Sequence, residues 1–304
     1  MNPIKFVYHA VRALVFPKYR FLALAHRGFY DNMPDEEYLK RMYEAAMGRK
    51  LDLDNPKTFN EKLQWLKLYD RRSEYTALVD KYEAKSIIAG MVGSEYVIPN
   101  LGVWDSFDDI DFDALPSSFV LKCNNDSGSV IVVQDKSRIN KTSARRIITS
   151  GLKTNYYLPG REWVYKNIKP RVLAEEYLPG KLVEYKIFCF DGKPGIILVC
   201  KGKAHALGRT NDYYDIDFRH LPVTANYPNS TEPQERPAQL DEILRLAEKL
   251  SAGIPHVRVD TYLVDGRVYV GEMTFYHNSG YTKFTPESWD EKFGEFITLP
   301  EKRS

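Results

Sequence analysis

Residues 256–275 place charged side chains at the spacing of a β-strand. Arg258 and Asp260 lie two residues apart in an apolar run, so both side chains point to the same face of an extended strand. On the expected returning strand, Glu272 and Thr274 are also two residues apart. Such a hairpin brings together an arginine, two carboxylates and a hydroxyl, which can bind a cation beside an anion.

The register of this hairpin decides whether Asp260 and Glu272 meet. A strict two-residue turn at Asp265-Gly266 places Gly271 opposite Asp260 and turns Glu272 to the other face. A three-residue loop with a glycine bulge instead places Glu272 opposite Asp260. Two facing carboxylates repel each other unless a cation neutralises them, and oxygen ligands suit Mg²⁺. An ordinary exposed hairpin with solvated charges is the alternative.

Two upstream segments carry residues that can bind a nucleotide. Lys122 lies near the end of an apolar strand, and the polar loop after it contains Gly128 and can fold over phosphates. A lone glycine between strands is more often a simple turn. Further on, a Glu-rich hinge at Glu175 precedes a strand that carries Lys186. This hinge can present backbone groups to an adenine, although a charge at a strand end explains each Glu equally well.

Helices are expected before these strands. Residues 1–95 show helical spacing, with one start at 33–37, a capping box of Thr58 and Glu61, and a third helix over 74–88. Beyond them, short apolar runs alternate with turn signals. The expected strands lie in 96–104, 118–124, 130–135, 171–178, 183–203 and 256–275, and further helices in 143–152 and 239–252. This pattern predicts an α+β fold with antiparallel sheet.

The composition argues against a nucleic-acid-binding protein. The net charge is +2 over 304 residues, and Lys and Arg alternate with Asp and Glu, whereas nucleic-acid binding usually needs a strongly basic domain. The three cysteines, Cys123, Cys189 and Cys200, lie in apolar runs without a C-x-x-C pair. Small core residues in a reducing compartment are therefore expected, and we expect a cytoplasmic protein.

The stretch from Phe6 to Ala25 is apolar, but its charges and Pro17 break any membrane span or signal peptide. It is also basic and aromatic, which suits a peripheral contact with the inner membrane. A terminal helix with solvated Lys and Arg is the commoner explanation.

The order of these features resembles the ATP-grasp superfamily. In D-alanine–D-alanine ligase and its relatives, R-x-D is followed by E-x-N; here Thr274 stands where Asn is usual. Most of the chain from Tyr38 to Pro300 resembles the TupA-like ATP-grasp family, named for a teichuronopeptide biosynthesis protein. The resembling segments are 55–70, 79–85, 98–104, 115–129, 161–178, 185–199 and 258–280.

The resemblance implies an ATP-grasp fold, in which two α+β subdomains clamp ATP between antiparallel sheets. It implies a helical N-terminal region over 1–95, a lid subdomain over 96–174 and a C-terminal subdomain with the metal site over 175–304. ATP and Mg²⁺ would serve to join a carboxylate to an amine through an acyl phosphate. The family's connection with surface polysaccharides implies a uronic-acid-containing saccharide and an amino acid or other amine as substrates. It also implies that the basic N-terminal stretch could contact other polysaccharide-assembly proteins.

The resemblance also implies roles for particular residues. Asp260, Glu272 and Thr274 would hold the metal, and Arg258, Lys122 and Gly280 would act on the reacting groups. The nucleotide would contact Lys81, Lys85, Lys122, Asn124, Ser127, Gly128, Ser129, Glu175, Glu176, Tyr177, Leu178, Glu184 and Lys186. The candidate residues for the acceptor are Arg161, Trp163, Lys166, His205, Arg209 and Ser279. Surface charge and core packing explain each acceptor candidate at least as well.

Other classes of protein remain open. A glycosyltransferase needs a D-x-D motif, and three runs offer one: Asp52-x-Asp54, Asp109-x-Asp111-x-Asp113 and Asp215-x-Asp217. A sugar kinase on the same fold would form ADP without an amine. A non-catalytic scaffold would use the basic N-terminus as its contact, but it would not need two facing carboxylates.

Overall fold

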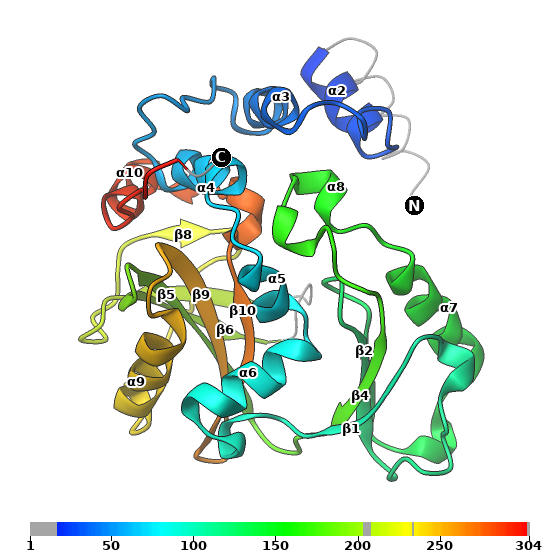
Figure 1. Ribbon diagram of the computed structural model, residues 1–304. Coiled ribbons are helices and arrows are strands. Elements are labelled where there is room, and N and C mark those ends of the chain that lie inside the picture. Colours follow the sequence, from blue (N-terminus) through cyan, green and yellow to red (C-terminus); the bar gives the residue numbers. More distant parts are fainter. Residues whose placement is uncertain (1–16, 203–207, 233, 303–304) are drawn as a thin grey trace.

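The computed structural model describes residues 17–202, 208–232 and 234–302. Two antiparallel sheets lie side by side beneath a layer of helices (Figure 1). The predicted α+β class is therefore confirmed. The predictions made for the basic residues before Pro17 and for His205 fall outside the described residues.

The N-terminal part of the chain is helical, as predicted. It forms α2 (Pro17–Ala25), α3 (Asp35–Met47), α4 (Phe59–Tyr69), α5 (Glu74–Val79) and α6 (Glu83–Val92). Thr58 and Glu61 form the predicted capping box at the start of α4. The single helix predicted over 74–88 is wrong. Asp80 takes an extended conformation, and its carboxylate accepts hydrogen bonds from the Tyr82 and Glu83 amides, so one helix ends and another begins there.

A four-stranded sheet has the order β1-β4-β2-β3. Its strands are β1 (Asn100–Trp104), β2 (Phe119–Cys123), β3 (Val130–Val133) and β4 (Val172–Glu176). Helix α7 (Lys141–Leu152) packs against β2. The segment after α7 contains the short helices α8 (Tyr157–Gly160) and η4 (Trp163–Tyr165). Of the other 3-10 turns, η1 is Ser94–Tyr96, η2 is Phe107–Asp109 and η3 is Lys136–Arg138.

A five-stranded sheet has the order β10-β9-β5-β6-β7. Its strands are β5 (Leu182–Phe190), β6 (Lys193–Lys201), β7 (Thr210–Tyr214), β9 (His256–Val264) and β10 (Arg267–Thr274), and α9 (Leu240–Ser251) covers one face. The predicted hairpin at Asp265-Gly266 is present, and Asp191-Gly192 joins β5 to β6 in the same way. Asp265 and Gly266 have φ of 47° and 81°, the left-handed pair that a two-residue hairpin turn requires.

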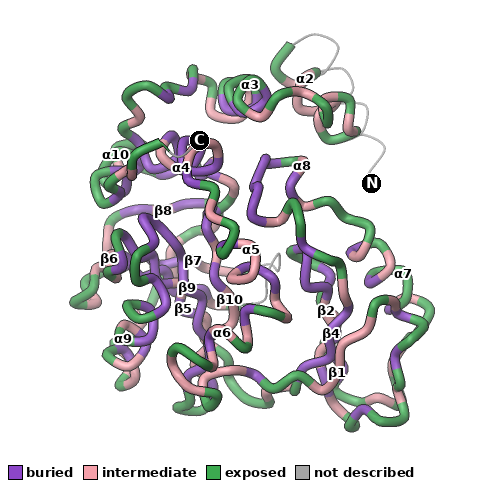
Figure 2. Tube along the Cα trace, in the orientation of Figure 1, coloured by how far each residue is buried: buried purple, intermediate pink, exposed green. Residues whose placement is uncertain are grey.

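The remaining elements connect the two ends of the chain. The turn η5 (His277–Gly280) follows β10, β8 (Thr224–Ala225) pairs with β11 (Phe284–Thr285), and α10 (Ser288–Glu295) packs on α4. The ring of Phe59 in α4 lies 6.0 Å from Phe188 and 6.2 Å from Phe293, and all three residues are fully buried. Helix α4 is therefore part of the main core, in which buried residues line the five-stranded sheet (Figure 2).

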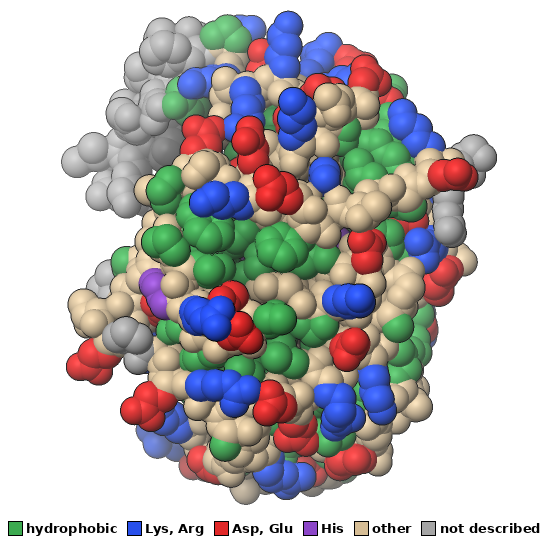
Figure 3. All heavy atoms as spheres, turned by 90° about the vertical axis from the view of Figure 1, so that its left-hand side faces the viewer, with side chains coloured by type: hydrophobic (Ala, Val, Ile, Leu, Met, Phe, Trp, Pro, Cys, Tyr) green, Lys and Arg blue, Asp and Glu red, His purple; other side chains and the backbone are tan. Residues whose placement is uncertain are grey.

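None of the described helices combines the length and the hydrophobicity that a membrane span needs. On the face shown in Figure 3, Lys and Arg are interspersed with Asp and Glu. This face therefore lacks the continuous basic patch that nucleic-acid binding usually needs.

Candidate active site

The β9–β10 hairpin combines both features that the sequence presented as alternatives. Its turn has two residues, with Arg267 paired to Val264, yet Glu272 is paired with Asp260. The register shifts by one residue between Val270 and Glu272, so Gly271 forms a bulge. A Cβ atom at Gly271 would lie 2.6 Å from the ring of Tyr262, which explains why a glycine stands there. The bulge turns Glu272 to the face of Asp260.

Three charged side chains meet on this hairpin and its neighbour β5, and we call them the arginine network: Arg258, Asp260 and Lys186. Arg258 donates from Nε and Nη2 to the two oxygens of Asp260 at 2.6 and 2.7 Å. Lys186 Nζ lies 2.5 Å from Asp260 Oδ2. Burial opposes ionisation of Asp260, but Arg258 and Lys186 outweigh it and hold the pKa of this carboxyl below its ordinary range. Burial likewise opposes the charge on Lys186, yet Asp260 raises its pKa overall.

Glu272 and Thr274 extend this network towards solvent. Glu272 Oε1 accepts a hydrogen bond from Thr274 Oγ1 at 3.3 Å and lies 3.6 Å from Arg258 Nη2. Its side chain is 37% exposed, whereas Asp260 has no exposed surface. Glu272 is therefore the carboxylate of the hairpin that can accept a new partner without breaking a buried ion pair.

His277 is a contact of Arg258 that the sequence did not indicate. Its Nδ1 lies 2.5 Å from Arg258 Nη1. Burial, with Arg258 nearby, lowers the pKa of His277 well below its ordinary value, so the imidazole is neutral and Nδ1 accepts the hydrogen bond.

A second buried ion group, the lysine network, lies on the four-stranded sheet and α6. Glu175 Oε1 lies 2.6 Å from Lys85 Nζ and 2.7 Å from Lys122 Nζ. Burial lowers the pKa of Lys85 to about 8, although Glu175 opposes the shift. Two ammonium groups thus share one carboxylate, which leaves an excess of positive charge in this network.

The loop between β2 and β3 is held at its two ends. Asn124 is fully buried, donates to Asp80 Oδ2 at 2.9 Å and accepts from the Arg171 amide at 2.6 Å, so its side chain anchors the loop. Ser129 Oγ donates to Asp126 Oδ2 at 2.5 Å, and Lys81 Nζ donates to the Asp126 carbonyl at 2.5 Å. Ser127 and Gly128, between these anchors, are exposed.

A cleft of about 320 Å³ lies between strands of the two sheets. Among the residues predicted to bind nucleotide or metal, those that line it are Lys81, Lys122, Ser127, Gly128, Glu175, Glu176, Tyr177, Leu178 and Glu272. Those that do not line it are Lys85, Asn124, Ser129, Glu184, Lys186, Asp260 and Thr274. Lys85 is instead paired with the lining residue Glu175, and Lys186 is paired with Asp260.

Sequence reasoning missed several lining residues. The apolar ones are Ile98, Val120, Val130, Val132 and Leu182, and the others are Cys123, Asp126, Tyr262 and Gly271. Val130 and Val132 are 50% and 55% exposed, which is unusual for strand valines. The cleft thus has an apolar wall beside its charged groups, and such a wall is typical of a small-molecule site.

The acceptor candidates separate into buried and accessible residues. Arg161 has no exposed surface; it lies over the ring of Tyr38 at 4.1 Å and donates to the carbonyls of Tyr30, Asp31 and Met33. Trp163 is also buried. These contacts give Arg161 a role in holding the chain before α3, and they leave its guanidinium without access to a saccharide.

Among the described acceptor candidates Lys166 is exposed, whereas Arg209 and Ser279 are only partly exposed. Lys166 is exposed, with its Nζ 5.1 Å from the ring centroid of Tyr157. Arg209 pairs with Glu184 at 3.3 Å, so both belong to the rim of the arginine network. Ser279 lies in the turn after β10, where it contacts Lys67 of α4.

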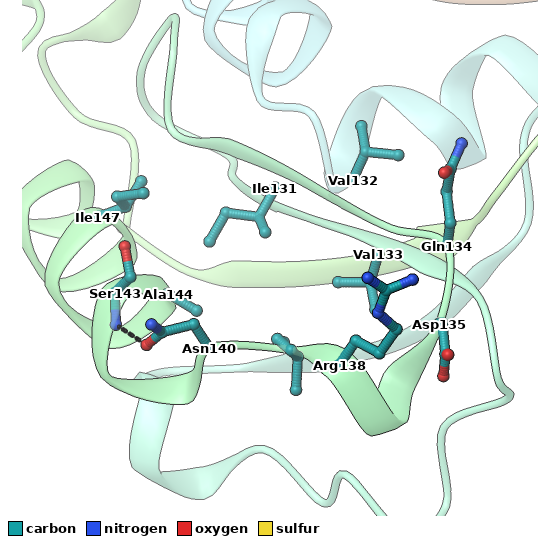
Figure 4. A pocket seen from close by; sticks show the side chains of 11 residues that line it. Ile131, Val132, Val133, Gln134, Asp135, Arg138, Asn140, Ser143, Ala144 and Ile147 are labelled. Carbon is teal, nitrogen blue, oxygen red and sulfur yellow. Dashed lines mark hydrogen bonds between the residues drawn. The ribbon is translucent and has the colours of Figure 1, made fainter.

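Another hollow, of about 350 Å³, lies between β3, η3 and α7. Figure 4 shows Ile131 and Ile147 facing it beside Arg138, with the Asn140–Ser143 hydrogen bond at one side. None of the residues predicted for nucleotide, metal or acceptor lines this hollow.

The D-x-D runs serve local turns. Asp52 Oδ1 accepts hydrogen bonds from the amides of Asp54 and Asn55. Asp111 Oδ1 accepts hydrogen bonds from the amides of Asp113 and Ala114. Asp215 Oδ1 accepts a hydrogen bond from the Arg219 amide. These are Asx-type turns, a structural role that accounts for an aspartate in each run.

Within the described part of the chain, no three His, Cys, Asp or Glu side chains gather closely enough to form a metal centre by themselves. A cation at the hairpin would have two carboxylates, a hydroxyl and ligands from outside the protein. Mg²⁺ is commonly bound in this way, by one or two carboxylates together with water and phosphate oxygens.

Two facing antiparallel sheets, with charged networks beside the cleft between them, define an ATP-grasp fold. The family model TupA-like ATPgrasp matches residues 61–298. The chain belongs to the TupA-like ATP-grasp family.

Solved structures similar to this chain include three enzymes. D-alanine–D-alanine ligase from Bacillus anthracis, complexed with ATP, is 22% identical over 66% of this chain and 55% of its own, with a TM-score of 0.39. L-amino acid ligase from Bacillus licheniformis is 16% identical over 85% of this chain and 55% of its own, with a TM-score of 0.42. N5-carboxyaminoimidazole synthetase from Staphylococcus aureus is 14% identical over 74% of this chain and 53% of its own, with a TM-score of 0.39. The chain thus spans little more than half the length of each structure. No curated protein matches it.

Proposed function

We propose that this protein is an ATP- and Mg²⁺-dependent ligase that joins a carboxylate to an amine. One observation carries the proposal: Glu272, opposite Asp260 on the hairpin, lines the same cleft as Lys122 and the exposed Ser127-Gly128 loop. A carboxylate for a cation, Glu272, and an ammonium group for phosphates, Lys122, thus face one space. Phosphoryl transfer needs this combination, because its catalysis depends on positioning and charge neutralisation.

In this proposal, the nucleotide lies along the cleft. Glu176, Tyr177 and Leu178 would frame the adenine, where the apolar lining is available for its ring. Lys81 and Lys122 would contact the phosphates, with the loop of Ser127 and Gly128 folded over them. Closing this loop would exclude water and so protect a reactive acyl phosphate from hydrolysis.

The hairpin fits a Mg²⁺ ion that arrives with the nucleotide. Glu272 and Asp260, with Thr274 beside them, would hold it, and the ion would neutralise charge on the transferred phosphoryl group. Because Asp260 already contacts Arg258 and Lys186, a metal would have to share or displace one of these contacts. The half-exposed Glu272 is free of that constraint.

The proposed reaction has two steps. The substrate carboxylate attacks the terminal phosphorus of ATP, giving an acyl phosphate and ADP. An amine then attacks the acyl carbon, phosphate leaves, and an amide is formed. Arg258 and the Gly280 amide would stabilise the negative charge that develops on the acyl oxygen.

For the substrates, we propose a uronic acid of a surface polysaccharide, or of its precursor, and an amino acid. The family is named for a teichuronopeptide biosynthesis protein, which supports this choice. Lys166 is the exposed candidate to meet the uronate, and Arg209 would have to leave Glu184 to do so. The described cysteines are all unpaired and buried, which agrees with a cytoplasmic location.

The test is Mg²⁺-dependent release of ADP by the full-length protein over a matrix of uronic-acid glycans and amino acids. ADP that requires both partners, with an amide detected by mass spectrometry and loss of both in Glu272→Gln, is the expected result. ADP with a glycan alone would instead assign a sugar kinase. The absence of any amide product with every pair would overturn the ligase assignment.

A further inference from the structure

Helix α4 carries a buried ammonium group that the proposed reaction does not use. Lys67 has no exposed surface, and its Nζ lies 5.1 and 5.7 Å from the ring centroids of Tyr281 and Tyr276. The opposite charge that acts on it is that of Glu162, which is also buried. Burial lowers the pKa of Lys67 to about 7, and Glu162 opposes that shift. A buried charge is retained only where its hydrogen bonds are satisfied.

The hydrogen bonds of Lys67 converge on the segment after β10. Its Nζ donates to the Ser279 carbonyl at 2.8 Å, to Ser279 Oγ at 3.0 Å, to the Gly160 carbonyl at 2.7 Å and to Gln64 Oε1 at 3.0 Å. Gln64 Nε2 in turn donates to the carbonyls of Ser279 and Gly280 at 3.0 and 2.8 Å. Two side chains of α4 therefore hold two successive carbonyl groups.

The held segment has an unusual backbone. Asn278, Ser279 and Gly280 all have positive φ, at 48°, 53° and 67°. A Cβ atom at Gly280 would collide with Gln64 Nε2, and one at Gly160 would collide with Ser279 Oγ. Residues in the left-handed region persist only when their surroundings fix them, and here α4 and the Gly160 turn enclose the segment from two sides.

This arrangement determines where the amide groups point. In a trans peptide, the carbonyl and the next N–H lie on opposite sides. Because the Ser279 carbonyl points to α4, the Gly280 N–H is turned away from α4. The same segment begins at His277, which accepts the hydrogen bond of Arg258. Its conformation thus affects two groups assigned to the acyl transfer.

We propose that Lys67 is a positioning residue: through Ser279, it holds the 277–281 segment in the conformation that directs the Gly280 N–H and seats His277 against Arg258. The role in catalysis rests on the proposed function, whereas the conformational role does not. The N-terminal helices are in this view part of the reaction machinery, because α4 supplies a support that neither sheet contains.

The test compares Lys67→Met with Lys62→Met in the full-length protein. Lys62 is a matched control, since it also lies in α4 and donates to backbone carbonyls, those of Gly294 and Ile297 at 2.9 and 2.8 Å. Hydrogen exchange is measured without nucleotide on peptides covering 277–281 and β9. In Lys67→Met, the amides of 277–281 should exchange at least about tenfold faster than in wild type, whereas the exchange of the β9 amides should change little. In Lys62→Met, the exchange of 277–281 should be unchanged.

Binding and turnover separate the conformational role from the proposed reaction. Lys67→Met should bind a non-hydrolysable ATP analogue with Mg²⁺ as wild type does, and its kcat should fall at least about tenfold at unchanged KM for ATP. If Lys67→Met does not fold, Gln64→Leu should loosen the same amides more mildly.

Unchanged exchange at 277–281 in both Lys67→Met and Gln64→Leu would overturn the proposal, as would equal loosening by Lys62→Met. Failure of the wild-type protein to bind the ATP analogue would instead count against the proposed ligase alone.

Discussion

The two charged networks beside the cleft are built in opposite ways. In the lysine network, Lys85 and Lys122 share a single oxygen of Glu175, so positive charge is in excess. In the arginine network, Asp260 uses both oxygens to bind Arg258 and Lys186, and Glu272 beside it is half exposed. The first arrangement has two ammonium groups for one carboxylate and attracts an anion. In the second, Asp260 and Glu272 together balance Arg258 and Lys186, and the partly exposed Glu272 stays available for a cation.

The difference shows how one cleft can hold a phosphate chain and its metal together. Excess positive charge on both walls would repel Mg²⁺, and two balanced walls would attract phosphates weakly. Five predictions follow from this contrast, from the largest expected effect to the smallest.

The strongest change within the arginine network is Asp260→Asn. It removes the buried carboxylate that Arg258 and Lys186 share, so we expect a loss of about 3–5 kcal/mol in the free energy of unfolding. We expect Glu272→Gln to change stability by less than about 1 kcal/mol, because its side chain is partly exposed. Both should lower ADP release at least about 100-fold. Urea unfolding and ADP assays test this pair, and an active Glu272→Gln enzyme would remove Glu272 from the metal site.

Lys122→Met tests the excess charge of the lysine network. Lys122 lines the cleft, so its removal should weaken binding of an ATP analogue about 10- to 100-fold. Lys153→Met, an exposed lysine just after α7, is the control and should bind normally. Calorimetric titration measures both, and equal affinities would place the phosphates elsewhere.

The two networks should respond to pH with opposite signs. The pKa of Lys85 is about 8, below its ordinary value of 10.5, so between these values the unfolded chain binds the proton more tightly and the stability from this group rises with pH. The pKa of Lys186 is raised, so its stabilisation is present below 10.5 and is lost only above it.

Unfolding of wild type, Lys85→Met and Lys186→Met between pH 8 and 10 measures this contrast. The advantage of wild type over Lys85→Met should grow with pH, whereas that over Lys186→Met should stay constant. A constant difference for Lys85→Met would show that its proton is not displaced by burial.

Gly271→Ala tests the bulge that brings Glu272 opposite Asp260. The new methyl group would meet the Tyr262 ring, so we expect a loss of about 1–3 kcal/mol and weaker Mg²⁺-dependent activity. Gly90→Ala in α6 is the control: nothing lies within 4 Å of its Cβ position, and a helical Gly→Ala change should stabilise by about 0.5–1 kcal/mol. Thermal unfolding measures the stability of both variants. If Gly271→Ala is as stable as wild type, the Tyr262 ring moves aside freely.

Thr274→Val should have the smallest effect. It removes the hydroxyl that accepts from Arg258 at 3.1 Å and donates to Glu272 at 3.3 Å while keeping the shape of the side chain. We expect the activation free energy to rise by about 1 kcal/mol, which lowers kcat a few-fold, and the affinity for ATP to stay unchanged. A loss as large as that in Glu272→Gln would instead make Thr274 a direct metal ligand.

Much of the fold was readable from local patterns. The capping box at Thr58 and the Asp-Gly turns act between residues a few positions apart, and the structure contains them. The helix predicted over 74–88 failed because Asp80 caps a second helix while its other oxygen binds Asn124, 44 residues away. Helical periodicity does not record such a contact.

The residue types of the candidate site were also readable, but their surroundings were not. Lys122 and Glu175 were chosen separately as phosphate and adenine contacts, yet they form one ion pair. Arg161 has the chemistry to bind a uronate, but it is enclosed by carbonyl groups from residues before α3. Side-chain chemistry alone does not distinguish a ligand contact from a buried support.

The sequence by itself determined the α+β class, the hairpin with its two acids and the family to which the chain belongs. Tertiary structure decided the bulge at Gly271, the pairing of the charges and the support of Ser279 by Lys67, 212 residues away. The reason is physical: turns and caps depend on neighbouring residues, whereas the charge state and direction of a buried group depend on whichever distant elements exclude water around it.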